Sequence, residues 1–242
     1  MNATRSFYLL VALAGIAGSG CNSEVNVAAN QSILLQGGVS LELVKTPRGF
    51  WIGKTEVTQA QWKAVMGDNP SEFKGDEFPV ENVSWNDCKA FLDKLNSLPT
   101  ANTIGLTFRF PTDAEWEYAC RAGSTDRFCQ AEGGAEITNE SLPLVAWMKT
   151  DSEGKPHQVA TKQPNAFGLF DMIGNVDEWV AETCGAVDSD AKDTEYAEDR
   201  VTRGGNFRDS ANYCLSGIRG RNAPGNRSNT IGLRLCASAN VH

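Results

Sequence analysis

The sequence predicts an α+β fold, in which short helices and short strands are joined by long loops. Three observations support this class. Gly (23 residues) and Trp (6 residues) are prominent among the 242 residues, which is typical of a loop-rich fold anchored by aromatic side chains. Three clear helix starts lie between residues 58 and 115. Short apolar runs bounded by glycine and polar turns lie on both sides of them and indicate strands.

The first and last expected elements are strands. ILLQGGVSLELV, near residues 34–44, predicts a strand, a Gly-Gly turn and a second strand. GFWIGKTEVT, residues 49–58, predicts a third strand. NTIGLRLCAS, residues 229–238, alternates enough to be the last one.

The helices are expected where capping residues precede an apolar stripe. Thr58 is followed three residues later by Gln61, and Thr112 by Glu115, which is the pattern of a capping box. Ser84 is the cap of the helix between them. The predicted helices cover residues 59–66, 85–97 and 113–120.

The N-terminus has the pattern of a secretion signal. Arg5 is followed by an apolar run, residues 7–18, that is too short to span a bilayer well. Small residues then lead to Cys21, as at a bacterial lipoprotein cleavage site, although Gly18 replaces the usual Leu. We expect a signal peptide over residues 1–20, lipid on Cys21, a tether over 21–33 and one domain over 34–242.

The net charge of the chain and its expected cellular location limit the kinds of partner that it can bind. The net charge is −8, and an acidic chain repels phosphate, so nucleic acid is not expected as a partner. A lipid on Cys21 would be the only membrane attachment, and Asn22 and Ser23 carry no acidic retention signal, which favours the outer membrane of the bacterial cell envelope. Secretion without lipid is the alternative. Only His157 and His242 are present, which argues against a His-rich metal site or a Ser-His-Asp triad.

Six cysteines follow Cys21, and they could form three disulfides in an oxidising compartment. We expect the pairs Cys214–Cys236 and Cys88–Cys120. The alternative is that some cysteines are buried free thiols, which behave as small apolar side chains. The six are Cys88, Cys120, Cys129, Cys184, Cys214 and Cys236.

An acidic stretch inside an apolar run, DMIGNVDEWV at residues 171–180, is the most unusual motif. Charge this dense is costly to bury unless something compensates it. The residues alone leave two interpretations open, a calcium site and acids exposed on a turn. Calcium prefers carboxylate and carbonyl oxygens, which a glycine-containing turn can direct inward.

Four stretches together resemble the formylglycine-generating enzyme (sulfatase-modifying factor) family. They are FWIGKTEVTQAQW, PVENVSWNDCKAFLDKLN, FRFPTDAEWEYACRAGS, and PNAFGLFDMIGNVDEW followed by RGGNFRDS, RGRNAP and IGLRLC. The resemblance covers about residues 34–237. It implies a variant of the C-type lectin fold with little regular secondary structure. It also implies structural Ca²⁺ bound by side-chain oxygens of Asp171 and Glu178 and by the carbonyls of Gly174 and Val176.

The same resemblance implies an oxidase that uses copper(I) and oxygen to convert a cysteine of a sulfatase-type peptide to formylglycine. Family enzymes bind copper with two cysteines spaced Cys-x4-Cys after a Gly-Gly-Ser segment. Here the pair is Asp209 and Cys214, the serine is Asn206, and a usual tryptophan is Asp177. One thiolate does not suit copper(I), so these departures weigh against oxidase activity.

We therefore expect a non-catalytic domain that binds an envelope protein, a peptide or a glycan. An active copper oxidase is one alternative. A variable binding protein diversified by a retroelement is another, since Asn206, Asn212, Asn222, Asn226 and Asn229 enrich the end of the chain in asparagine.

The predicted ligand face is basic within an acidic chain, which favours an anionic ligand. Arg219 and Arg221 could instead be structural, bridging loops to carboxylates. The face is expected to comprise Phe207, Arg208, Asn212, Tyr213, Arg221, Asn222 and Arg227, with Asn206, Asp209 and Arg219 beside them.

Overall fold

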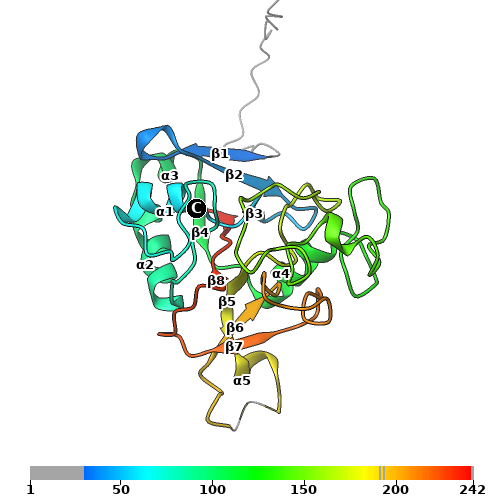
Figure 1. Ribbon diagram of the computed structural model, residues 1–242. Helices are drawn as coiled ribbons and strands as arrows, with labels where there is room; N and C mark the ends of the chain where they lie inside the picture. The colour runs from blue at the N-terminus through cyan, green and yellow to red at the C-terminus, as the bar shows by residue number, and fades with distance from the viewer. Residues whose placement is uncertain (1–29, 191, 193, 241–242) are drawn as a thin grey trace, which may run out of the picture.

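A computed structural model describes residues 30–190, 192 and 194–240 of the protein. The expectations for the signal peptide, for Cys21 and for most of the tether concern residues outside this range. Two sheets form the centre of the fold, with α1, α2 and α3 on one side and the long loops around α4 on the other (Figure 1).

The first sheet has five strands in the order β1-β2-β3-β9-β4, and all neighbours are antiparallel. The three expected N-terminal strands are present, and the first begins at Gln31, inside the segment expected as a tether. Gly37 and Gly38, with positive φ angles, form the turn between the first two. The strands are β1 Gln31–Leu34, β2 Ser40–Lys45, β3 Trp51–Gly53, β9 Cys236–Ala239 and β4 Leu106–Arg109.

The second sheet has four strands in the order β7-β6-β5-β8, in which β5 and β8 are parallel. The last expected strand is therefore divided between β8 in this sheet and β9 in the first. The chain crosses between the sheets at residues 233–235 and buries Arg234 there. The strands are β7 Gly220–Asn222, β6 Arg200–Arg203, β5 Asp177–Thr183 and β8 Ile231–Gly232.

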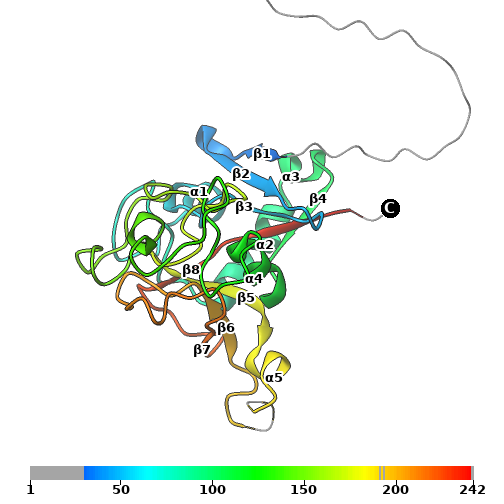
Figure 2. The same cartoon turned by 90° about the vertical axis from the view of Figure 1, so that its right-hand side faces the viewer.

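All three predicted helices are confirmed to within one residue. A capping box precedes each of them, and Ser84 has Asp87 as its reciprocal partner. The short α3 was not predicted. The α5 region projects from the second sheet in both views (Figures 1 and 2). The helices are α1 Gln59–Met66, α2 Trp85–Asn96, α3 Pro99–Thr103, α4 Asp113–Arg121 and α5 Cys184–Val187, with 3₁₀ turns at Gln36–Gly38 and Leu142–Leu144.

The core consists of two clusters of apolar side chains separated by β5. Trp179 belongs to the cluster beneath α1 and α2, where Trp62 stacks on Phe91 with ring centroids 5.0 Å apart. Val180 belongs to the other cluster, around Trp116 of α4. Successive strand residues face opposite sides, so β5 contributes to both. Within the described part of the chain, no helix has the length and apolar character needed to cross a membrane.

Candidate functional site

Residues 171–178 form a buried turn that leads into β5. Asp171, Gly174 and Asn175 have φ angles of 54°, 79° and 58°, in the left-handed region. A Cβ atom on Gly174 would lie 2.3 Å from the carbonyl oxygen of Trp147, so the close approach of the two backbones requires glycine. Asp171 and Glu178 are 2 % and 0 % exposed, so they are not acids on a surface turn.

Glu178 is paired with an arginine from the end of the chain. Arg234 Nε donates to Glu178 Oε1 at 2.9 Å, and Nη2 lies 2.8 Å from the same oxygen as an ion-pair contact. Nε1 of Trp116 donates to its Oε2 at 2.5 Å. Arg234 Nη1 donates to the carbonyl of Gly53, and Nη2 donates to that of Phe170. Both Glu178 oxygens therefore have partners.

Two further carboxylates lie near this pair. Glu56 Oε1 accepts the Val176 N–H at 3.1 Å, and its Oε2 accepts from the Asn175 amide at 2.8 Å. Burial, reinforced by Asp171 and Glu178, raises the pKa of Glu56 well above its usual value. Burial also raises the pKa of Asp171 to about 6. Three carboxylates around one guanidinium leave excess negative charge in the interior.

The residues expected to bind calcium fit this ion only in part. Asp171 Oδ2 accepts the Ala160 N–H at 2.7 Å, but its Oδ1 is buried without a hydrogen-bond partner, so it is available to a hard cation. Glu178 fits poorly because Arg234 and Trp116 occupy its oxygens. No group of three or more His, Cys, Asp or Glu side chains arranged to bind a metal ion occurs among the residues that the structure describes.

The three departures from the oxidase pattern contact one another. The Asn206 side-chain amide donates to Asp177 at 2.8 Å and to Asp209 at 2.7 Å. The Asn206 backbone N–H also donates to Asp209, at 3.1 Å. Burial raises the pKa of Asp177 to about 7 and raises that of Asp209 as well. One neutral amide thus links two carboxylates.

Cys214, at the second copper position, is 0 % exposed. Burial, with further contributions from Asp209 and Asp177, raises the pKa of its thiol to about 12. Copper(I) prefers two soft thiolates, and Asp209 supplies only a hard carboxylate at the first position. The residues at the expected copper position do not fit copper(I).

The expected disulfides Cys214–Cys236 and Cys88–Cys120 are wrong in this structure. All six described cysteines are buried free thiols, as in the alternative interpretation. Cys88 packs in the cluster beneath α1 and α2, while Cys120 packs in the other cluster. Cys236 lies in the centre of the first sheet, paired with Ile52 and Arg109, and Cys214 lies against Gly205.

Most of the predicted ligand face is at the surface, but Phe207 is not. Its ring is 0 % exposed and lies edge-on to Phe73, with centroids 5.7 Å apart. The Phe207 N–H donates to the carbonyl of Asn175, so this residue anchors the loop to the buried turn. The exposed members are Arg208, Asn212, Tyr213, Arg221 and Arg227, and Asn222 is partly buried.

The arginines of this face have different roles. Arg219 Nη2 lies 2.6 Å from Asp113, which confirms the structural interpretation for Arg219. Arg227 likewise pairs with Asp87, and its guanidinium holds the pKa of that carboxyl well below its usual range. Arg221 instead lies 3.6 Å from the ring centre of Tyr196, and no carboxylate of the described residues is within ion-pair distance.

Several residues that organise the site were not predicted from the sequence. Arg203 is 0 % exposed, and it binds Asp113 through Nε and the carbonyls of Ser216 and Ile218 through Nη1. Arg234 was equally unexpected, as was Glu56. Arg234 could have been found, because a charged residue inside the apolar run IGLRLC is the same signal that marked residues 171–180.

Comparison with known proteins places these features in a family. A model of the sulfatase-modifying factor enzyme 1-like domain matches residues 22–239. The chain belongs to this family. Its architecture is the C-type-lectin-like fold of the formylglycine-generating enzymes, as the resemblance implied.

The relatives of this sulfatase-modifying factor-like chain differ in how much of their length matches it. It is 30 % identical to Chaperone protein LppX of Paenibacillus barcinonensis, over 96 % of this chain and 98 % of LppX. It is 28 % identical to mouse formylglycine-generating enzyme, over 75 % of this chain but only half of that enzyme. The solved structure of Treponema denticola variable protein 1 superposes with a TM-score of 0.71 at 28 % identity, covering 86 % of this chain and 99 % of that one.

Proposed function

We propose that this domain is a binding module that lacks the oxidase chemistry of its family and holds a protein or peptide on the exposed part of residues 206–229. The observation that carries the proposal is the contact of Asp177, Asn206 and Asp209 at the expected copper position. A carboxylate and a single buried Cys214 thiol stand where two thiolates would be needed.

Two further observations support a protein partner. LppX, which the chain matches over nearly its full length, is named a chaperone. Tyr213 is 61 % exposed and Arg208 of the same segment is also exposed, and Tyr and Arg are enriched at the energetic centres of protein interfaces. A lipid on Cys21 would hold the module at the surface of the bacterial cell envelope.

The absence of oxidase chemistry is tested with a peptide containing Cys-x-Pro-x-Arg. The purified protein is incubated with this peptide, copper and oxygen, with mouse formylglycine-generating enzyme as the positive control. We expect the peptide mass to stay unchanged. Loss of the peptide thiol with gain of an aldehyde, abolished by Cys214→Ser, would show that the protein is an oxidase.

The binding face is tested by aggregation of reduced, unfolded lysozyme, followed by light scattering. We expect the protein to slow aggregation and the double variant Arg208→Ser/Tyr213→Ser to do so several-fold less well. Leu144→Ser is the matched control, because Leu144 is 52 % exposed but lies outside residues 206–229. No effect of the wild type, or an equal loss in the control, would refute a protein-binding role for this face.

Structural calcium remains part of the proposal, at Asp171 with the carbonyls of Gly174 and Val176. Glu178, the other expected ligand, would have to release Arg234 or Trp116 to join them. The support is the partnerless Asp171 Oδ1 among excess carboxylates. Calcium that binds only the folded state should raise the unfolding temperature. We expect this rise in the wild type and in Asp209→Asn, and not in Asp171→Asn. An unfolding temperature unaffected by millimolar calcium in the wild type would exclude the site.

A second candidate function is a diversified binding protein, which the likeness to Treponema denticola variable protein 1 favours. Asn212 and Asn226 are exposed and could vary freely, whereas Asn206 is buried and bonded to two carboxylates. Sequencing this gene in many isolates tests the idea. We would expect changes at codons 212 and 226 and none at 206, together with a template repeat and a reverse transcriptase nearby. Their absence would remove this candidate.

A further inference from the structure

A groove with both polar and apolar walls lies along the outer face of β2 and includes no residue of the 206–229 segment. It consists of two adjoining hollows of about 520 and 360 Å³, which share Glu42 and Lys54 in their walls. The groove therefore belongs neither to the altered copper position nor to the proposed protein-binding face.

Strand alternation and neighbouring loops build the walls of the groove. Along β2, Leu41 and Leu43 point into the core, so Ser40 and Glu42 face outward. Opposite them, the segment after β3 contributes Lys54, Thr55 and Gln61 to the lining.

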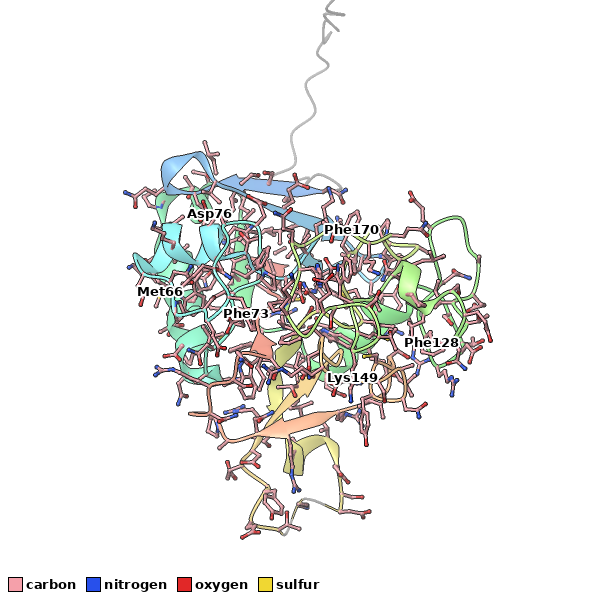
Figure 3. All side chains as sticks on the ribbon, in the orientation of Figure 1. Met66, Phe73, Asp76, Phe128, Lys149 and Phe170 are labelled. Carbon is pink, nitrogen blue, oxygen red and sulfur yellow. The ribbon has the colours of Figure 1, made fainter. Side chains whose placement is uncertain are left out.

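The third side of the groove is made by loops from the second half of the chain. Val159 and Glu77 line the larger hollow. The Val159 N–H donates to the carbonyl of Glu77 at 3.0 Å. Phe170, labelled in Figure 3, donates its N–H to the carbonyl of Lys54 at 3.0 Å, and its ring centre lies 5.9 Å from Lys54 Nζ. Phe167, whose ring lies 5.5 Å from that of Tyr118, borders the smaller hollow.

The charged pair at the junction has unused hydrogen-bonding capacity. Lys54 Nζ contacts Glu42 Oε2 at 2.8 Å, and the two side chains are 41 % and 54 % exposed. An ammonium has three N–H donors and a carboxylate two acceptor oxygens, so one contact leaves groups of both kinds available. Adjacent hydroxyls of one ligand could donate to Glu42 and accept from Lys54 at the same time.

We propose that this groove binds a neutral saccharide. The hydrogen-bonding groups that Glu42 and Lys54 leave free match a ligand rich in hydroxyl groups, whereas Thr55 and Gln61 are already hydrogen-bonded within the protein. Phe167 adds an apolar side chain to the lining, suited to the C–H face of a sugar ring. Glu42 and Glu77 against the single Lys54 disfavour anionic sugars. The linked, solvent-open hollows suit a chain of rings rather than an enclosed small molecule.

The test is binding of the full chain to an array of immobilised neutral and anionic glycans. We expect neutral glycans to be retained, and retention to be about tenfold weaker in Lys54→Met and in Glu42→Gln, since each removes a charged hydrogen-bonding group. Lys45→Met is the matched control, because Lys45 lies on the same strand but outside the hollows. Both groove variants should fold, because exposed ion pairs contribute little stability.

Three outcomes would overturn the saccharide site. They are no glycan retained by the wild type, a preference for anionic glycans, and glycan binding that Tyr213→Ser abolishes while Lys54→Met leaves it intact. This inference is independent of the proposed protein-binding function. A failed lysozyme experiment with glycan retention sensitive to Lys54 would leave the saccharide site standing, and the reverse result would leave only the protein-binding face.

Discussion

At the scale of single residues, Arg234 connects three distant parts of the chain. Its guanidinium binds Glu178 at the start of β5, the Gly53 carbonyl at the end of β3 and the Phe170 carbonyl in the loop before the buried turn. The interior tolerates this charge because every nitrogen of the guanidinium has a partner. Arg234 therefore fixes how the two sheets meet.

We expect Arg234→Met to lower the free energy of unfolding by about 3–5 kcal/mol, because it leaves Glu178 buried without its counter-charge. Urea unfolding measures the change. The double variant Arg234→Met/Glu178→Gln should recover part of the loss. Lys89→Met, which breaks the exposed pair with Asp93, is the control and should change stability by less than about 1 kcal/mol. Equal effects of Arg234→Met and Lys89→Met would contradict this account.

A second prediction at this scale concerns pH. Glu81 is fully buried, its Oε2 has no hydrogen-bond partner, and burial raises its pKa from the ordinary 4.5 to about 7. Between these two values the folded state retains a proton that the unfolded state releases. The contribution of Glu81 to stability is therefore favourable below pH 4.5 and is lost as pH rises through about 7.

We expect Glu81→Gln to remove this dependence. The stability difference between Glu81→Gln and the wild type should shift in favour of the variant by at most about 3 kcal/mol between pH 4 and pH 8, because one pKa unit corresponds to 1.36 kcal/mol. Urea unfolding at several pH values measures it. A difference that is the same at both ends of the range would show that Glu81 titrates normally in the folded protein.

At the scale of elements, the buried turn at 171–178 depends on one glycine more than on its acids. Gly168 and Gly174 have φ angles of 78° and 79°, but a Cβ atom at Gly168 would meet nothing within 4 Å, whereas one at Gly174 would strike the Trp147 backbone. An alanine at residue 168 would therefore add backbone strain alone, whereas an alanine at residue 174 would add the same strain and a steric clash.

We expect Gly168→Ala to lower stability by about 1 kcal/mol, the penalty of a left-handed alanine. Gly174→Ala should lower stability by at least about 2 kcal/mol more, because the Trp147 segment must also move away. Thermal or urea unfolding of both variants checks this. Similar losses of stability in the two variants would mean that the Trp147 segment moves away from the 171–178 turn at little cost.

Local signals explain which elements could be predicted. The capping residues Thr58, Ser84 and Thr112 act on their own helices, so sequence alone located those helices to within a residue. The prediction of a single strand at 229–238 was wrong. The chain divides there into β8 and β9 because Arg234 binds Glu178, which is 56 residues away in the sequence. A long-range contact of this kind leaves no periodic pattern.

At the scale of the whole molecule, the six described cysteines behave as core side chains. We expect none of them to react rapidly with a thiol reagent in the native state, and all six to react after unfolding. Cys184, at 7 % the most exposed of them, should react first. A reducing agent should leave the unfolding temperature unchanged. A fall of several degrees would show that disulfides stabilise the protein after all.

The candidate site could be predicted only in part. Family positions Asp177, Asn206, Asp209 and Cys214 were identified, but their mutual bonding follows from backbone folding that no motif records. The exposure of individual side chains could not be predicted from the sequence either. Phe207 was expected on the ligand face with its neighbours, but it is buried. Disulfides were expected and free thiols were the alternative, and this expectation was wrong because packing places Cys88 and Cys120 in different clusters.

The position of β9 has a consequence for the order of assembly during synthesis. β9 is the last described strand to leave the ribosome, yet it lies between β3 and β4, in the interior of the five-stranded sheet. Until it arrives, β3 and β4 lack a common neighbour and both present an open edge. The sheet therefore cannot be completed during synthesis until residues 236–239 have emerged, so the strands between residues 31 and 109 do not reach their final arrangement before then.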